Sequence, residues 1–394
     1  MSARQGRLPF PEAPLKRRLA LALSTALALG AVAAPLAAAV PAQAVVAPAP
    51  GAPDAKALAE SLAGLPDGDA TAALVRVGGK GGSWHGTAGV RDLRGGAKAL
   101  EHARFRAGST TKVVTAATVL RLAAAGEVDL DAPVQRYLPG LFDGTAFRQP
   151  ISVRQLLNHT SGIQPADGWG DAFADQYAHR FDVVTPTQVA ALALAKGPAF
   201  APGTRQQYLN INYTLLGLLV EKVTGDSYAQ AAARLVLRPA GVRHTYFPGT
   251  DGRIHGPHNR GYQLVDGEFV DVTEWVQADR SAAGDMISTT ADLERLLTAL
   301  FRGRIVPEPQ LEEMFTPPAG LDDATMSAGL QKIEIGGRVY WGKSGSRYGY
   351  GTGIAADREL TRTLVYSVNS TDAKGENMNP VAQRIVMASA RNAD

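Results

Sequence analysis

The chain of 394 residues contains no cysteine. This absence excludes disulfide bonds, cysteine-ligated zinc, iron–sulfur clusters and thiol catalysis. It does not argue against export, because a domain of this size can be held together by its hydrophobic core alone. Aromatic residues are few, at 7%, but 45% of the residues are hydrophobic and 20% are charged, which is the composition of an ordinary globular protein.

Most of the chain also lacks an excess of basic charge. The first 44 residues hold five of the 40 basic residues and one of the 37 acidic residues, so the remainder has a net charge of −1. The formal net charge of +3 therefore arises in the N-terminal segment. We expect no nucleic-acid partner, because such binding needs a basic surface.

Residues 1–44 have the pattern of a secretory signal peptide. Lys16-Arg17-Arg18 is followed by an apolar run over residues 19–40 and a small-residue cleavage site at 42–44. A membrane anchor is the alternative reading, but Pro35 and the cleavage site favour removal. The arginine pair leaves the twin-arginine route open, although the flanking residues fit the Sec route better. We therefore expect a secreted protein without membrane contact after cleavage, with residues 45–53 as a linker.

Strand-like segments lie near both ends of the chain, and helices lie between them. The strand candidates are residues 70–77, 83–90, 329–335, 339–343, 350–356 and 361–368. The helix candidates are residues 54–63, 109–125, 211–224, 226–237, 290–301 and 378–390. Asp266-Gly267 predicts a hairpin turn.

This order predicts an α/β (α+β) fold in which an antiparallel sheet is built from both chain ends and flanked by helices. Residues 54–125 are expected to form the first part of the α/β domain. Residues 126–284 are expected to form a mainly helical inserted domain, and residues 285–394 complete the α/β domain.

Ser109-Thr-Thr-Lys112 at the start of a predicted helix is a candidate nucleophile motif. The i,i+3 spacing places the hydroxyl and the ammonium on one helix face. The helix N-terminus also favours a developing oxyanion. Lys112 can activate Ser109 if burial or a second cation lowers its pKa. The alternative is a helix cap followed by a solvated lysine.

Two further segments offer groups for the same chemistry. Tyr208 could carry a proton, and Asn210 could donate a hydrogen bond to a substrate carbonyl. Lys343 could supply the second cation that Lys112 needs. Gly345 would let a substrate backbone approach the strand edge, and the N–H of Ser346 could complete an oxyanion hole with that of Ser109.

Other candidate sites are weaker. Residues 337–344 match the phosphate-loop string G-x-x-x-x-G-K-[ST], but the glycine-rich residues 345–353 cannot begin the helix that such a loop requires. His255 and His258 have no third ligand nearby in the sequence and are expected to lie in a solvated loop. The chain has no G-x-S-x-G motif, which disfavours an α/β-hydrolase. We expect no metal and no organic cofactor.

The three motifs together resemble those of the penicillin-recognising serine hydrolases, the β-lactamase and D,D-peptidase superfamily. Ser-Thr-Thr-Lys, Tyr-Leu-Asn and Lys-Ser-Gly occur in that family's order and at about its separations. The chain is most similar to the branch of class C β-lactamases and secreted Streptomyces-type D-alanyl-D-alanine carboxypeptidases. Residues 153–163, 213–217 and 282–293 resemble accessory segments of the family, and His159 in the first of them is expected to be structural.

The resemblance implies a role for each motif residue. Ser109 would be the acylated nucleophile, Lys112 its activating partner, and Tyr208 the general base and acid. Lys343 would give electrostatic support. The substrate-binding residues would be Asn210, Ser344, Gly345 and Ser346, and we also expect Trp275 to line the cleft.

Three departures from the family pattern leave the identity of the substrate undecided. Leu209 stands where serine or alanine is usual, and Ser344 stands where threonine is usual. Gln331 and Lys332 lie where carboxypeptidases of this type have an arginine for the substrate carboxylate. The third departure weakens the expectation of strict carboxypeptidase specificity.

The sequence therefore predicts a secreted serine hydrolase for D-amino-acid peptides that resembles a D-alanyl-D-alanine carboxypeptidase or transpeptidase. The alternatives on the same site are a class C-like β-lactamase, an esterase or a D-aminopeptidase, and a non-catalytic penicillin- or peptidoglycan-binding protein is a remote one. The expected partners are peptides or peptidoglycan stems, with β-lactams as inhibitors or substrates, and the protein is expected to be a monomer.

N-terminal sequencing of the secreted protein tests the leader. We expect the mature chain to begin near Val45, because the cleavage site ends at Ala44. Secreted material that begins at Met1 would contradict this expectation.

Overall fold

The computed structural model describes residues 51–170 and 172–393. The predicted leader over residues 1–44 and most of the predicted linker over residues 45–53 lie outside the described residues. Among the residues described, no helix is both long and apolar enough to cross a membrane.

Helices and strands alternate along the described chain. The helices are α1 (Ala55–Ser61), α2 (Thr111–Ala124), α3 (Val134–Tyr137), α4 (Val153–Leu157), α5 (Phe173–Ala178), α6 (Pro186–Leu194), α7 (Asn210–Thr224), α8 (Tyr228–Ala232), α9 (Thr290–Phe301) and α10 (Pro380–Ser389). The strands are β1 (Ala70–Gly78), β2 (Trp84–Gly89), β3 (Phe105–Arg106), β4 (Tyr262–Val265), β5 (Glu268–Asp271), β6 (Ile287–Ser288), β7 (Gln331–Ile335), β8 (Arg338–Arg347), β9 (Tyr350–Ala356) and β10 (Thr363–Ser370).

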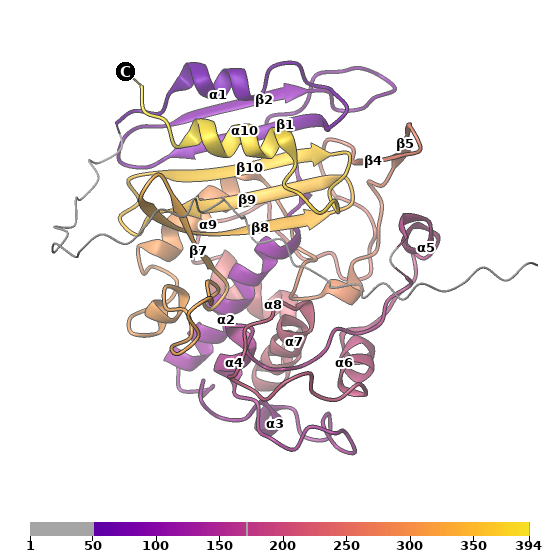
Figure 1. The fold of residues 1–394 in the computed structure, drawn as a ribbon, viewed down its shortest axis with the longest axis vertical. Helices are drawn as coiled ribbons and strands as arrows, with labels where there is room; N and C mark the ends of the chain where they lie inside the picture. Colours follow the sequence, from indigo (N-terminus) through magenta and orange to yellow (C-terminus); the bar gives the residue numbers. More distant parts are fainter. Residues whose placement is uncertain (1–50, 171, 394) are drawn as a thin grey trace, which may run out of the picture. The chain divides into compact units, whose positions relative to one another are not determined.

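Strands from both chain ends form one sheet in the order β2-β1-β10-β9-β8-β7 (Figure 1). Every neighbouring pair in this sheet is antiparallel. The N-terminal hairpin joins the C-terminal strands through β1 and β10, where Val75 lies opposite Tyr366. The predicted antiparallel sheet built from both chain ends is therefore confirmed.

Alternating side chains of the sheet serve two separate cores. Val75 and Tyr366 face α1 and α10, where Leu58 and Ile385 complete one cluster. Val365, the neighbour of Tyr366 on β10, belongs instead to the larger core that contains most of α2, α7 and α9. Figure 1 shows α1 and α10 lying against the sheet, whereas α3, α4, α6 and α7 of the middle segment lie away from it. Helix α9 also packs against the sheet.

Local sequence signals set the ends of several helices. Asn379 caps α10, because its side chain accepts hydrogen bonds from the N–H groups of Val381 and Ala382, and Pro380 occupies the first helical position. Gly225 ends α7 in the left-handed conformation with φ 70°. The predicted hairpin at Asp266-Gly267 is confirmed, since it joins β4 to β5.

Several predicted boundaries differ from the structure, and three of the differences have a clear structural cause. The helix expected from residue 109 begins at Thr111, because residues 108–110 form a tighter 3₁₀ turn. The helix expected over residues 226–237 changes after Ala232 into a π-helical turn. The strand expected to end at residue 343 continues to Arg347. Residues 344–347 keep pairing with β9, although the Ser-Gly-Ser sequence at 344–346 has little strand propensity.

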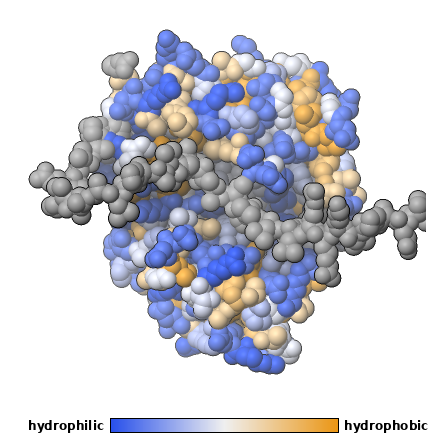
Figure 2. All heavy atoms as spheres, viewed as in Figure 1, coloured by the Kyte–Doolittle hydropathy of each residue, from blue (hydrophilic) through white to orange (hydrophobic). Residues whose placement is uncertain are grey.

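The face of the molecule shown in Figure 2 is covered mainly by hydrophilic residues, with smaller hydrophobic areas between them. Among the exposed large hydrophobic side chains are Trp169, Phe181 and Phe269.

Candidate active site

Ser109 lies in a tight turn that leads into α2. Thr110 donates through its hydroxyl to the carbonyl of Ala107, and Thr111 donates to that of Gly108, over 2.9 and 2.7 Å. Gly108 has φ 53°, a conformation that favours glycine. The Ser109 side chain is half-buried at the start of the helix and stays accessible to a substrate.

Lys112 is fully buried one turn further along, with 0% exposure. Its Nζ lies 3.2 Å from Ser109 Oγ, 2.7 Å from Asn210 Oδ1 and 2.6 Å from the carbonyl oxygen of Ala283. These contacts use the three donors that an ammonium offers. None of the three partners is a carboxylate, so the positive charge is solvated by dipoles and is not neutralised.

The segment that carries Ala283 is fastened to α2 and α7. Thr115 donates to the carbonyl of Ala282 over 2.6 Å, and the N–H of Met286 donates to Thr111 Oγ1 over 3.1 Å. Gly217 on α7 makes room for it, because a Cβ there would lie 2.6 Å from the Cβ of Ala282. The structure thus gives a physical reason for Gly217 and for the accessory segment that begins at residue 282.

Tyr208 lies between two lysine cations. The centre of its ring is 4.9 Å from Lys112 Nζ and 4.6 Å from Lys343 Nζ. Its hydroxyl oxygen is buried and makes no well-formed hydrogen bond to the described residues. The phenol is therefore shielded from water but surrounded by positive charge.

Burial and neighbouring charges lower the pKa values of Lys112 and Tyr208 toward neutral pH. Burial lowers the pKa of Lys112 to about 8, and the Lys343 cation acts in the same direction. Burial alone would raise the pKa of Tyr208, but the cations of Lys112 and Lys343 outweigh it and lower that pKa to about 7. Because the two groups interact, their protons are lost in coupled steps near neutral pH.

His159 supports the loop that carries Tyr208. Its Nδ1 accepts from the N–H of Leu209 over 3.3 Å and from Asn212 Nδ2 over 3.1 Å, and Ser161 fixes the orientation of Asn212 by donating to its Oδ1. The rings of His159 and Tyr208 lie 4.7 Å apart. Burial, together with Lys112 and Lys343, lowers the pKa of His159 well below its usual value, so the ring is neutral.

Strand β8 and the turn of Ser109 come into close contact, and each has a glycine at the contact: Gly345 in the strand and Gly108 in the turn. A Cβ on Gly345 would lie 2.9 Å from the Ser109 nitrogen, and one on Gly108 would lie 2.5 Å from the Ser346 nitrogen. The backbone nitrogens of Ser109 and Ser346 therefore both lie at this close contact, and we propose that together they form an oxyanion hole. Pairing of β7 with β8 ends at Gly342, so among the described strands none pairs with the second edge of residues 343–347.

The remaining predicted site residues lie at different depths. Asn210 is bound to Lys112 through Oδ1, which leaves its Nδ2 free to donate to a substrate carbonyl. Ser344 is exposed, and Gly345 is buried at the contact with the nucleophile turn. Trp275 is buried with 6% exposure and contacts the ring of Tyr348, so it lies behind the surface of the cleft.

Two groups near the motif residues carried no sequence signal. Lys374, in the loop between β10 and α10, donates to the carbonyl oxygen of Ser346 over 3.4 Å. The Ala283 carbonyl that binds Lys112 belongs to the backbone, so residue type could not have revealed it.

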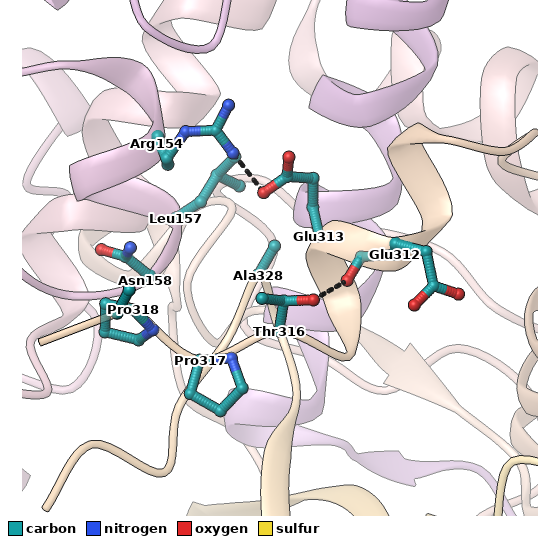
Figure 3. A pocket seen from close by; sticks show the side chains of 10 residues that line it. Arg154, Leu157, Asn158, Glu312, Glu313, Thr316, Pro317, Pro318 and Ala328 are labelled. Atoms are coloured by element: carbon teal, nitrogen blue, oxygen red, sulfur yellow. Dashed lines mark hydrogen bonds and ion pairs between the residues drawn. The ribbon is translucent and has the colours of Figure 1, made fainter. Parts of the chain in front are cut away.

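A separate hollow lies beside Arg154 and is shown in Figure 3. Arg154 pairs there with Glu313, and it also pairs with Asp131 over 2.7 Å. The hollow is bordered further by Pro317, Pro318 and Ala328 and contains none of the predicted site residues. Its one arginine is neutralised by carboxylates, so it has neither a nucleophile nor an unpaired charge.

No cluster of potential metal ligands occurs among residues 51–170 and 172–393. His255 Nε2 lies 2.7 Å from Asp251 Oδ2, and His258 Nδ1 lies 2.8 Å from the carbonyl oxygen of Gly256. His255 is exposed and His258 is half-buried.

The family model described as Beta-lactamase matches residues 55–387. The chain belongs to the beta-lactamase family. It is similar to penicillin-binding proteins and belongs with them to the superfamily of beta-lactamase-like serine hydrolases.

Two solved structures and one curated relative are similar to this chain. A D-stereospecific amidohydrolase from Streptomyces sp. is 31% identical, with a TM-score of 0.73 over 86% of this chain and 99% of that chain. A D-amino acid amidase from Ochrobactrum anthropi SV3 is 25% identical, with a TM-score of 0.68 over 84% of this chain and 97% of that chain. Penicillin-binding protein 4* from Bacillus subtilis (strain 168) is 27% identical over 289 residues, 68% of this chain. The chain spans 61% and 50% of the length of the first two curated relatives.

Substitution of Gly345 tests the contact between β8 and the nucleophile turn. We expect Gly345→Ala to lower kcat/KM by about 100-fold, since displacement of the oxyanion hole by 1 Å costs on that order. The matched control is Gly351→Ala on β9, where a Cβ would meet nothing closer than 3.9 Å. Equal activity of the two variants would contradict the assigned contact.

The pH profile tests the cations around Tyr208. Lys343→Met removes one of the two cations that stabilise the phenolate, so the pKa of Tyr208 should rise from about 7. The rising limb of kcat/KM against pH should then move to higher pH by about one pH unit. Lys222→Met, an exposed lysine on α7, is the control that should leave the limb in place. A limb that does not move in Lys343→Met would show that Lys343 does not act on the titrating group.

Proposed function

We propose that this protein hydrolyses amide bonds of D-amino acids and their peptides through an acyl-enzyme on Ser109. Cleavage of a terminal D-alanine, as in a D-alanyl-D-alanine carboxypeptidase, is one form of this reaction. The observation that carries the proposal is the position of Ser109 Oγ, 3.2 Å from a buried ammonium and next to a tyrosine whose pKa is lowered to about 7.

Acylation begins when Ser109 Oγ attacks the amide carbonyl carbon and its proton passes to the Tyr208 phenolate. The carbonyl oxygen becomes negatively charged and accepts hydrogen bonds from the backbone N–H groups of Ser109 and Ser346. The C–N bond then breaks, and Tyr208 returns the proton to the departing amine. Ser109 is left as an ester of the acyl group.

Deacylation uses the same groups in the opposite direction. Tyr208, again a phenolate, takes a proton from a water molecule as the water oxygen attacks the ester carbonyl carbon. The bond to Ser109 breaks, and the serine oxygen recovers a proton from Tyr208. Lys112, in its protonated form, and Lys343 stabilise each phenolate stage.

The D-configuration of the substrate is supported by similarity. The amidohydrolase from Streptomyces sp. is D-stereospecific by its description, and it matches this chain over 99% of its own length. A second candidate function is β-lactam binding or hydrolysis, which the similarity to Penicillin-binding protein 4* favours. Both functions would use the same nucleophile and differ in how quickly water reaches the acyl-enzyme.

Secretion belongs to the same proposal. A protein exported through a leader in residues 1–44 would meet D-amino-acid peptides outside the cytoplasm.

The test combines intact mass with turnover. We expect D-alanine amide to be hydrolysed, and benzylpenicillin to add one equivalent of mass to the mature protein. Ser109→Ala should lose the adduct and lower kcat by at least about 10⁴-fold, because the nucleophile is removed while the half-buried site keeps its fold.

Each other outcome contradicts a part of the proposal. Hydrolysis of benzylpenicillin without a lasting adduct and without amide turnover would replace the amidase by a β-lactamase. No adduct, with the antibiotic and the amide both intact, would leave the esterase as the remaining activity. Substantial amide turnover by Ser109→Ala would refute the nucleophile itself.

A further inference from the structure

Tyr208 lies in a segment without regular secondary structure. Residues 205–209 lead into α7 and belong to no helix or strand themselves. A general base must stay within hydrogen-bond reach of the group that it deprotonates, so contacts from outside this segment have to hold Tyr208 in place. The two backbone N–H groups that flank Tyr208 have the same partner, His159.

His159 accepts a hydrogen bond from each neighbour of Tyr208. The N–H of Gln207 donates to the carbonyl oxygen of His159 over 2.8 Å, and the N–H of Leu209 donates to Nδ1 of its ring over 3.3 Å. The ring also contacts the phenol, with the ring centres 4.7 Å apart and an angle of 49° between the ring planes. One residue therefore contacts Tyr208 itself and binds the residues on both sides of it.

The backbone of His159 has a conformation that is uncommon outside glycine. Its φ is 63°, in the left-handed region, and the residue is buried with 3% exposure. Such a conformation costs free energy and persists where the surrounding contacts over-determine it. The hydrogen bonds from Gln207 and Leu209 are among these contacts, so the local strain of His159 is tied to the position of the Tyr208 segment.

The hydrogen bonds also determine which ring nitrogen of His159 carries the proton. Nδ1 accepts from the N–H of Leu209 and from Nδ2 of Asn212, whose amide is oriented by Ser161. A nitrogen that accepts hydrogen bonds has no proton of its own, so the proton of the neutral ring is on Nε2. Nδ1 is thus occupied by the protein and is not available as a base for a substrate.

We propose that His159 is the positioning residue for Tyr208 and keeps its phenol between the cations of Lys112 and Lys343. This inference rests on the proposed function, since it concerns the general base of that reaction. The other titratable group near the phenol is Tyr213 on α7, which is buried and uncharged at neutral pH. Because the attraction between a cation and a phenolate falls with distance, a displaced Tyr208 would be harder to ionise and would lose its geometry for proton transfer.

Two substitutions separate the ring of His159 from its backbone conformation. Glycine and asparagine both accept a positive φ, but only asparagine places an acceptor, Oδ1, where histidine has Nδ1. We expect His159→Gly to lower kcat for D-alanine amide by about 100-fold with KM nearly unchanged, because displacement of a catalytic group by about 1 Å costs on that order. His159→Asn should keep kcat within about fivefold of the unaltered protein.

Tyrosine ionisation gives a second readout that needs no substrate. The ultraviolet absorbance of the phenolate, with Tyr208→Phe as the reference, should show Tyr208 titrating at about pH 7 in the unaltered protein. In His159→Gly this titration should move to higher pH by about one unit, and in His159→Asn it should stay in place. His102→Gly, at an exposed histidine in a turn, is the control that should change neither readout.

The outcomes distinguish this inference from the proposed function. Unchanged kcat and titration in His159→Gly, or a His159→Asn protein that behaves like His159→Gly, overturns the positioning role. A fall in kcat without a shift of the titration also overturns it, because Tyr208 would then have kept its surroundings. Absence of amide turnover in the unaltered protein overturns the proposed function, and the titration still decides the role of His159 in that case.

A measurement on the unaltered protein covers the case in which His159→Gly does not fold. The ¹⁵N chemical shifts of the His159 ring, assigned by their loss in His159→Asn, should show Nδ1 without a proton and Nε2 with one. A proton on Nδ1 would exclude the hydrogen bond from Leu209 and with it the positioning role.

Discussion

A lysine ammonium buried without a carboxylate is the constraint around which the site is organised. Lys112 must satisfy its donors with neutral oxygens. It finds one in Ser109, one turn earlier, and one in each of two distant segments, at Asn210 and at the carbonyl of Ala283. A buried charge is tolerated only where such dipoles are held in place, and their arrangement here depends on α2, on α7 and on the segment around residue 283. The charge that is costly to bury also lowers the pKa of Tyr208, so the structural cost and the chemical benefit have the same origin.

The second constraint is steric and lies on the other side of Ser109. Strand β8 and the nucleophile turn come so close that neither Gly345 nor Gly108 has room for a side chain. Sheet and helices therefore meet beside Ser109, and the proposed oxyanion hole would take one N–H from each. The two cores of the protein are large, but the active site depends on this contact between backbones.

The parts of the site that are local in sequence could be predicted. Ser109 and Lys112 are one helical turn apart, and that spacing alone puts them in contact. The antiparallel sheet followed from strand patterns at both chain ends. Tyr208 and Lys343 are separated from Ser109 by about 100 and 230 residues, so only the order of the motifs linked them, and no pattern gave their distance from the phenol ring.

The features that could not be predicted from the sequence are backbone groups and contacts that depend on the tertiary structure. The Ala283 carbonyl has no residue-type signature, and Lys374 lies in a polar loop where a lysine is unremarkable. Strand β8 extends through small polar residues because β9 holds them, which is a tertiary effect that overrides propensity. The contact of Tyr348 with Phe173 depends on α5, a helix of six residues of which none is buried.

The pairing of β1 with β10 has a consequence for how the protein is made. Ala70 lies opposite Ser370, so β1 finds its central neighbour only after nearly the whole chain has left the ribosome. Closing a loop of that length is entropically slow, and contacts of such sequence separation form late in folding. The helical core around α2 and α7 draws on the middle of the chain and can assemble earlier. A partly synthesised chain would therefore carry the serine and its lysine without the strand that completes the oxyanion hole, and would be catalytically silent until its C-terminal strands arrive.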